Sequence, residues 1–185
     1  MRITGGFLKG RKLKSPPGSS KEIRPLRTRI RKALFDTLTD DLTGWKVLDL
    51  FAGTGALGIE AISRGADFVL FVEVSPLAIK LIKDNIQNLG ITEKTKILKT
   101  SLPEGLKIIK TRYPGFFDLV FVTPPYKKGL AKKCLEGFPW EVLKEKAVLV
   151  VEEHSEVPLP EELKRAKLVK KKTYGETTLH FYEVV

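Results

Sequence analysis

The stretch VLDLFAGTGALGIEA, residues 47–61, joins a short apolar run to three closely spaced glycines and a second apolar segment. The run around Asp49 is typical of a buried strand, and Gly53, Gly55 and Gly58 open a helix behind it. Glycines let the backbone turn tightly and approach a ligand, and N–H groups at a helix start favour polar or anionic groups. The Gly-x-Gly-x-x-Gly spacing also matches the dinucleotide fingerprint, which is a weak signal by itself. The stretch therefore predicts a strand–turn–helix unit with a ligand at the turn.

Strands and helices alternate along the chain from residue 44 onward. We expect strands near 46–51, 68–73, 95–99, 117–122 and 146–152, and helices near 56–64, 76–89, 103–112, 129–137 and 140–144. This alternation predicts a parallel sheet with helices on both faces. The segments KLVKKKTYG (167–175) and TTLHFYEVV (177–185) predict a terminal antiparallel hairpin on one sheet edge. The expected fold is thus α/β with a mostly parallel, seven-stranded sheet.

Length and composition narrow the class of protein. A chain of 185 residues with 42% apolar residues is long enough for one domain with one core. The apolar runs are short, and the first residues lack the apolar region of a signal peptide, so we expect a soluble, cytoplasmic protein with no membrane association. The single cysteine, Cys134, excludes an internal disulfide and a cysteine-based metal cluster. We expect a monomer without a bound metal.

Positive charge is concentrated in the first 32 residues. This arm carries one acid, Glu22, against eleven basic residues, whereas the rest of the chain is close to neutral. Segregated charge of this kind is typical of a surface that binds phosphates, and the alternative is a solvated, mobile tail. Glycines between apolar residues over 3–13 predict a small hairpin, and SPPGSSKEIRP (15–25) predicts a flexible link.

A helical period begins at Leu26. Apolar residues recur every four positions at Leu26, Ile30, Leu34 and Leu38, and basic residues occupy the other faces. The apolar side of this helix is expected to pack against the rest of the protein, while its basic sides contact phosphate groups. We therefore divide the chain into a basic N-terminal arm, residues 1–43, and a catalytic domain, residues 44–185, which together are expected to form one compact unit.

Two acids define the ligand expected at the carboxyl ends of the strands. Glu73 ends the second strand, where a carboxylate can bond both hydroxyls of a ribose. Asp49 lies four residues before Gly53, where it would repel a pyrophosphate and attract a cation. S-adenosylmethionine fits, because it has a ribose, a zwitterionic amino-acid end and no phosphate. A nicotinamide dehydrogenase is the least favoured reading, since no catalytic domain follows the fingerprint.

The motifs resemble those of a known family. DLFAGTGALG together with TPPY is similar to the class I S-adenosylmethionine-dependent methyltransferases. The order of RITGGFLKGRKL, RPLRTRIRKALFDTL, LDLFAGTGALGIEAISRGA, TPPY and YGETTLHFYE resembles the RsmD family of small-subunit (16S) rRNA guanine N2-methyltransferases along essentially the whole chain. The resemblance implies a Rossmann-like class I methyltransferase fold. It also implies methylation of guanine 966 at N2, on an assembled or assembling 30S particle.

The resemblance further implies roles for DLVFVTPPYKKG, residues 118–129. The side chain of Thr123 and the carbonyl of Pro124 would accept the N2 hydrogens, Pro125 would stiffen the loop and Tyr126 would stack on the flipped base. Position 123 departs from the family, which has Asp or Asn there, and a neutral hydroxyl forms a weaker hydrogen bond than a carboxylate. The departure predicts a slower reaction, greater reliance on the Pro124 carbonyl, or no activity.

The remaining site residues follow from the same resemblance. The cofactor is expected to contact Asp49, Phe51, Gly53, Gly55, Gly58, Glu73, Val74, Ser101 and Leu102. Ser101 is a second departure from the family's Asp or Asn, and it can alternatively cap a helix before Pro103. The RNA is expected to contact Arg2, Lys9, Arg11, Lys12, Arg24, Arg27, Arg29, Arg31, Lys127 and Lys128. The run 170–172 of lysines fits either an RNA surface or a protected edge strand.

Two other functions stay open. The Pro-Pro-Tyr loop suits any planar nitrogen nucleophile, so the substrate could be DNA adenine or a protein glutamine. The missing acid at position 123 also fits a non-catalytic rRNA-binding assembly factor.

Overall fold

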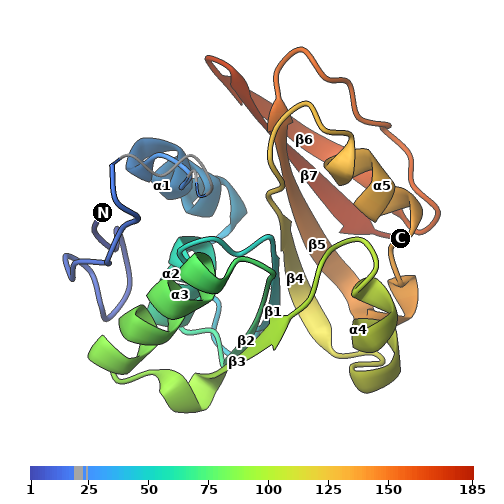
Figure 1. Ribbon diagram of the computed structural model, residues 1–185. Helices are drawn as coiled ribbons and strands as arrows, with labels where there is room; N and C mark the ends of the chain where they lie inside the picture. The colour runs from blue at the N-terminus through green and yellow to red at the C-terminus, as the bar shows by residue number, and fades with distance from the viewer. Residues whose placement is uncertain (19–22, 24) are drawn as a thin grey trace. The chain divides into compact units, whose positions relative to one another are not determined.

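The computed structural model describes residues 1–18, 23 and 25–185, and the chain forms two compact units, Met1–Lys99 and Thr100–Val185 (Figure 1). The expected division into a basic arm and a catalytic domain is a division by function, and it stays a prediction. The first unit contains α1 (Thr28–Leu38), β1 (Lys46–Leu50), α2 (Ala56–Ser63), β2 (Phe68–Glu73), α3 (Pro76–Asn88), a short 3-10 helix η1 (Thr92–Lys94) and β3 (Thr95–Lys99). The second contains α4 (Leu106–Arg112), β4 (Phe117–Val122), α5 (Leu130–Glu136), a 3-10 helix η2 (Trp140–Val142), β5 (Leu143–His154), β6 (Ala166–Tyr174) and β7 (Thr177–Val184).

Three parallel strands form the sheet of the first unit, in the order β3-β2-β1. Nearly every residue of β1 and β2 is buried, as is usual for parallel strands covered on both faces. Helix α3 follows β2 because Ser75 accepts a hydrogen bond from the Ala78 N–H, and Pro76 occupies the first helical position. The carboxyl ends of β1 and β2 therefore lie side by side, and the predicted ligand residues Asp49 and Glu73 lie in their last two residues.

The predicted N-terminal hairpin is present in a minimal form. A single antiparallel bridge joins Arg2 and Lys12, and the Ile3 N–H donates to the Arg11 carbonyl at 3.0 Å. The tip lies on the last turn of α2, where the Phe7 N–H donates to the Ser63 carbonyl at 2.8 Å. A Cβ atom at Gly6 would meet that Ser63 carbonyl oxygen at 1.8 Å. The contact therefore requires glycine at position 6.

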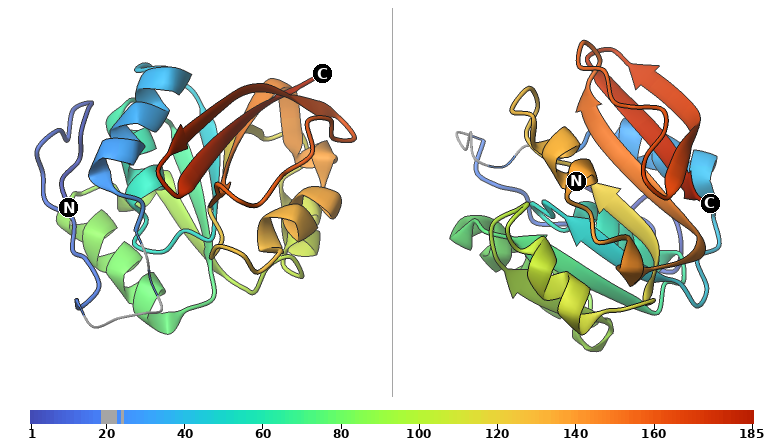
Figure 2. Two further views of the ribbon diagram at one scale, coloured as in Figure 1. Left: turned by 90° about the horizontal axis from the view of Figure 1, so that it is seen from above. Right: turned by 90° about the vertical axis from the view of Figure 1, so that its right-hand side faces the viewer.

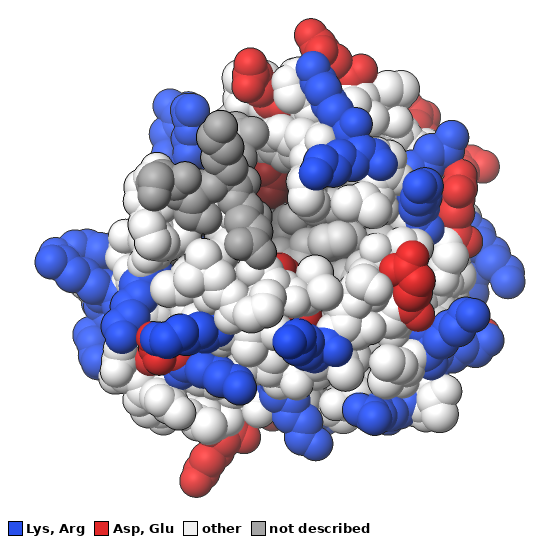
Figure 3. Space-filling model, viewed as in Figure 1, with Lys and Arg blue, Asp and Glu red and all other residues white. Residues whose placement is uncertain are grey.

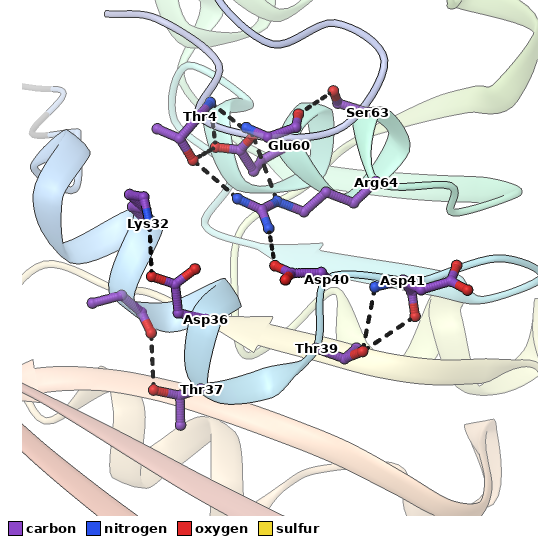
Figure 4. A network of polar contacts seen from close by, with 12 residues as sticks. Thr4, Lys32, Asp36, Thr37, Thr39, Asp40, Asp41, Glu60, Ser63 and Arg64 are labelled. Atoms are coloured by element: carbon purple, nitrogen blue, oxygen red, sulfur yellow. Dashed lines mark hydrogen bonds and ion pairs between the residues drawn. The ribbon is translucent and has the colours of Figure 1, made fainter.

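A buried polar network attaches the hairpin to α2 and α1 (Figure 4). Glu60 accepts hydrogen bonds from the Thr4 N–H at 3.0 Å and the Gly5 N–H at 3.2 Å. Its Oε1 atom also lies 3.3 Å from the Nε atom of Arg31, and both side chains are fully buried. Arg64 extends the network by pairing with the exposed carboxylate of Asp40 at 2.8 Å. These contacts make the hairpin part of the first unit rather than a solvated tail.

The strands of the second unit lie in the order β4-β5-β7-β6. β5 is parallel to β4, and β7 runs antiparallel to both β5 and β6. Figure 2 shows β6 and β7 as a long twisted hairpin, which confirms the predicted terminal hairpin. β6 is the edge strand, and its exposed lysines suit the protection of an edge.

Three predictions for the second unit are wrong: the helix over 140–144, the start of the following strand and the start of the helix over 103–112. Instead of a helix over 140–144, the chain forms a 3-10 turn, and β5 begins at Leu143 with a shift of register against β4 before Leu119. The charged run 144–146 hides this early start of the strand. Helix α4 begins at Leu106 rather than at 103. Residues 101–105 form a turn instead, in which the Gly105 N–H donates to the Ser101 carbonyl at 2.8 Å.

No helix among the described residues is both long and apolar enough to span a membrane.

Candidate cofactor and substrate sites

The glycine turn lies between β1 and α2, as the sequence predicts. Phe51, Gly53 and Gly55 all have positive φ angles, and Gly55 is the N-cap residue of α2. Gly58 is needed for packing, because a Cβ atom there would meet Cε1 of Phe71 at 2.4 Å. The helix therefore lies directly against β2, and its first turn carries the Gly58 N–H to the end of β1.

Asp49 is buried beneath this turn with one oxygen atom unused. Its Oδ2 atom accepts the Gly58 N–H at 3.1 Å, whereas Oδ1 has no hydrogen-bond partner among the described residues. Burial raises the pKa of the Asp49 carboxyl well above its ordinary value, and the charge of Glu73 raises it further against the effect of the Gly58 N–H. An unpaired buried carboxylate is costly, and a cation beside it would remove that cost. The geometry fits a positively charged ligand and disfavours a phosphate.

Glu73 is the last residue of β2, the strand next to β1, and Val74 follows it. Glu73 is half-buried and pairs in register with Lys99 of β3, while Val74 is 53% exposed. The Coulomb effect of Glu73 on Asp49 places the two carboxyl groups near one another. In this unit the structure thus brings together Asp49, the glycine turn and Glu73.

Ser101 and Leu102 lie at the start of the second unit. Ser101 is exposed and Leu102 is buried. The alternative reading of Ser101 as a helix cap is wrong, because Gly105 is the N-cap residue of α4. A Cβ atom at Gly105 would collide with Thr100 at 2.2 Å, so this glycine keeps the turn compact ahead of the helix. The predicted contact of Ser101 and Leu102 with the adenine stays a prediction.

The Thr-Pro-Pro-Tyr loop follows β4. Thr123 is half-buried, Pro124 is buried and Pro125 is exposed. The Tyr126 hydroxyl donates to Glu152 of β5 and lies 2.6 Å from Oγ1 of Thr177. These contacts fix the position of the tyrosine ring, whose edge-to-face contact with His154 has a centroid distance of 5.9 Å. The loop is therefore held from two neighbouring strands.

Most predicted RNA-contacting residues are exposed, and Figure 3 shows Lys and Arg side chains over much of the face it draws, including the left, where Figure 1 places the N-terminal segment. The exposed residues of the set are Arg2, Lys9, Arg11, Lys12, Arg27, Arg29, Lys127 and Lys128. The ammonium group of Lys127 lies 2.9 Å from a carboxylate oxygen of Glu156. Arg24 lies outside the described residues.

Arg31 does not lie on the predicted surface. Its side chain is fully buried, and its guanidinium group contacts Glu60 and the Arg2 carbonyl. Burial lowers the pKa of Arg31 while Glu60 opposes the change, but the group stays charged. The prediction was wrong because the helical period of α1 places Arg31 on the face away from the apolar stripe. The period cannot show that the N-terminal hairpin covers that face.

Sequence reasoning also missed three buried acids. Glu60 lies in an apolar helix, and Glu152 and Glu153 come directly before His154, the last residue of β5. Charged residues are almost never fully buried unless they are paired. An acid inside an apolar helix or strand therefore signals a buried polar contact, and this signal was available in the sequence.

Comparisons with known proteins agree with this arrangement. The Escherichia coli protein yhhF, provisionally described as a methyltransferase, has a solved structure that matches with a TM-score of 0.83 and 28% identity. The match covers 100% of this chain and 97% of that one. The fold is that of the class I methyltransferases, which confirms the predicted fold class.

Sequence comparison identifies the family. Residues 1–183 match the family described as Conserved hypothetical protein 95, and the chain belongs to it. The Ribosomal RNA small subunit methyltransferase D of Buchnera aphidicola is 35% identical, with 97% of this chain and 91% of the relative covered. The Bacillus subtilis protein YlbH, provisionally named an rRNA methyltransferase, is 34% identical, with 99% and 98% covered. The resemblance to the RsmD family is confirmed.

Proposed function

We propose that this protein transfers a methyl group from S-adenosylmethionine to the exocyclic N2 atom of a guanine in small-subunit rRNA. The target is guanine 966, presented in an assembled or assembling 30S particle, and the protein acts as a cytoplasmic monomer. The observation that carries the proposal is the buried Asp49 carboxylate with its unused oxygen at the glycine turn. The names of the methyltransferase relatives support rRNA as the substrate.

The cofactor supplies an electrophilic methyl group when it is bound. Asp49 and the glycine turn would hold its amino-acid end, and Glu73 would accept hydrogen bonds from its ribose hydroxyls. Phe51, Val74, Ser101 and Leu102 are assigned to its adenosine part by the family resemblance. These roles favour a zwitterionic nucleoside over a dinucleotide, because no phosphate would lie beside Asp49.

The Thr-Pro-Pro-Tyr loop would prepare the nucleophile. An exocyclic amine on guanine is weakly nucleophilic because its lone pair is delocalised into the ring. Acceptance of its hydrogens by Oγ1 of Thr123 and the carbonyl of Pro124 would let the nitrogen become pyramidal. As the nitrogen gains the methyl group, the bond from that methyl to the sulfonium sulfur would break and leave S-adenosylhomocysteine, and the nitrogen would lose one proton to water. The ring of Tyr126, fixed through its hydroxyl, would stack on the base. Catalysis of this kind depends on positioning and fixed dipoles.

The basic N-terminal segment would bind the rRNA backbone, and α1 offers a direct test. We expect the double variant Arg27→Gln/Arg29→Gln to weaken rRNA binding and to lower the slope of log affinity against log salt by about 0.7–0.9 per lost phosphate contact. Both residues are exposed, so the fold should not change. Filter binding over a range of salt concentrations measures the slope, and Lys132→Gln on α5 is the matched control. An unchanged slope would remove α1 from the RNA surface.

Position 123 gives a second test. We expect Thr123→Asp to raise the rate of methyl transfer about tenfold, because a charge-assisted hydrogen bond is roughly twice as strong as a neutral one. Single-turnover methyl transfer to unmodified small subunits measures the rate, and Thr123→Val, which lacks a hydroxyl, should lower it. A slower Thr123→Asp variant would show that the threonine is adapted to this site.

The decisive experiment for the proposed function is incubation with labelled S-adenosylmethionine and small subunits that lack the modification, followed by mass mapping of the RNA. The expected result is one methyl group on N2 of guanine 966. Label on DNA or protein but not on rRNA would favour the adenine or glutamine alternative. Binding of both cofactor and rRNA without transfer would favour the assembly factor, a reading that Thr123 itself supports.

A further inference from the structure

The N-terminal hairpin places its apolar side chains in two different environments. Ile3, Leu8 and Leu13 are buried, whereas the phenyl ring of Phe7 is 67% exposed. A single exposed apolar residue is common on protein surfaces and needs no explanation by itself. In this hairpin, however, the ring is exposed directly beside the buried Leu8, at a tip whose backbone is fixed. The position of Phe7 therefore results from the fold of the hairpin rather than from a disordered end of the chain.

The backbone that carries the ring is held by hydrogen bonds on both sides. The Phe7 N–H donates to the Ser63 carbonyl of α2 at 2.8 Å. The Lys9 N–H donates to the Gly6 carbonyl at 3.2 Å, and Gly6 has a φ angle of +75°. A ligand that covers the ring would therefore have to order little more than one side chain, and this preorganisation favours binding.

Positive charge accompanies the ring. The first fourteen residues contain no acid and five basic residues, all exposed: Arg2, Lys9, Arg11, Lys12 and Lys14. Lys14 pairs with Asp84 of α3 at 3.3 Å. Cations beside an exposed aromatic ring suit single-stranded nucleic acid, because the cations attract the phosphates while the ring stacks on a base. The charge of the hairpin thus favours RNA over a protein partner.

We propose that Phe7 stacks on an unpaired base of the rRNA, at a place separate from the base that is methylated. The inference rests on the proposed function and adds a stacking contact to its RNA surface. Helix α2 follows Gly55 of the glycine turn and ends at Ser63, which contacts Phe7. Its eight residues span about 12 Å, so the tip of the hairpin lies about one helix length from the glycine turn. Phe7 would therefore hold the RNA without taking part in methyl transfer.

The test measures binding of protein-free 16S rRNA by filter binding over a range of salt concentrations. We expect Phe7→Ala to lower the affinity about fivefold to a hundredfold, the value of stacking on one base. The factor should be the same at every salt concentration, because stacking releases no counterions. Lys9→Gln should instead lower the slope of log affinity against log salt by about 0.7. A lower slope in Phe7→Ala would overturn the inference, since the ring would then act by positioning the cations.

Phe7→Leu is the matched control, because it keeps an apolar side chain but has no aromatic face. It should lose most of the affinity that Phe7→Ala loses, whereas Phe7→Trp should keep the affinity of the wild type. Ile108→Ala, which removes an exposed apolar side chain from α4, should leave the affinity unchanged. Full affinity in Phe7→Leu would overturn the inference, since any apolar contact would then be sufficient.

The kind of partner is tested with two further ligands. In double-helical RNA each base is covered by its neighbours, so Phe7→Ala should bind a duplex as tightly as the wild type does. An equal loss of affinity for duplex and single-stranded RNA would overturn the inference. A loss with assembled small subunits but not with protein-free rRNA would overturn it in favour of a ribosomal protein as the partner.

Single-turnover methyl transfer separates this inference from the proposed function. With saturating small subunits, Phe7→Ala should react at the wild-type rate, while the concentration needed for saturation rises with the lost affinity. If Phe7→Ala does not fold, which thermal unfolding would show, Phe7→Leu against Phe7→Trp decides. A wild-type protein that methylates no rRNA would contradict the proposed function. A wild-type protein that methylates rRNA but binds it no more tightly than Phe7→Ala would contradict only the role of Phe7.

Discussion

Substitution of Glu60 by Gln is expected to lower the free energy of unfolding by about 3–5 kcal/mol, the usual cost of removing one partner of a buried ion pair. Glu60 is the acceptor for the main chain of Thr4 and Gly5 and the partner of the Arg31 guanidinium group. Without its charge, Arg31 would be left buried beside a second guanidinium group, that of Arg64. Urea denaturation followed by circular dichroism measures the loss.

A neighbouring ion pair provides the control for this prediction. Lys32, next to Arg31 on α1, pairs with Asp36 at 2.8 Å, but both side chains are about half exposed. Asp36→Asn should therefore cost no more than about 0.5 kcal/mol. Because the penalty in Glu60→Gln comes from the lone charge of Arg31, adding Arg31→Met should recover part of the stability. A loss in Glu60→Gln as small as that in Asp36→Asn would contradict the assignment.

Substitution of Asp49 by Asn is expected to weaken binding of S-adenosylmethionine by about tenfold to a hundredfold, the value of a hydrogen bond to a charged group. Asparagine keeps nearly the same shape and an oxygen for the Gly58 N–H. Isothermal titration calorimetry measures the affinity. The unfolding free energy at neutral pH should not decrease, because the substitution removes a buried charge. Unchanged affinity would remove Asp49 from the cofactor site.

The raised pKa of Asp49 gives this prediction a dependence on pH. The folded protein binds the Asp49 proton more tightly than the unfolded chain does, so the contribution of this group to stability falls as pH rises through the raised pKa. Cofactor affinity should change in the opposite direction, because only the ionised carboxylate attracts a cation. As the pH rises above about 4, the ordinary pKa of an aspartate, the wild-type affinity should rise while that of Asp49→Asn stays nearly flat. If the cofactor affinities of the wild type and Asp49→Asn change with pH in the same way, a group other than Asp49 controls the pH dependence of binding.

The elements that the sequence predicts well are those with local signals. β2, β3 and β4 begin and end at the predicted residues. β2 and β4 are apolar runs bounded by charged or turn residues, and β3 has two apolar residues between lysines. Helix α3 was predictable for the same reason, from Ser75 and Pro76 before it and Gly90 after it. The glycine turn and Asp49 before it were also predictable, because a tight turn from a strand into a helix requires glycines. Local chemistry thus determined most of the sheet and the half of the site around Asp49.

The features that the sequence could not show depend on contacts between distant residues. Arg31 meets Glu60 from 29 positions away, and Tyr126 meets Glu152 from 26 positions away. No periodicity records such pairs, since each partner looks like an ordinary charged or aromatic residue. The early start of β5 was hidden because a charged run with a bulge at Lys146 does not read as a strand. These misses share a cause, which is that tertiary contacts override local preference.

The hairpin is anchored to α2 chiefly through its own main chain. Leu8 donates its N–H to Oγ of Ser63 at 2.9 Å, and the Gly5 carbonyl accepts from the same hydroxyl at 2.5 Å. The exposed side chains of Phe7 and Lys9 take no part in these bonds. The outward-facing residues of this loop can therefore be replaced without loss of its attachment to α2, so the sequence of the proposed RNA surface can change while the scaffold stays the same.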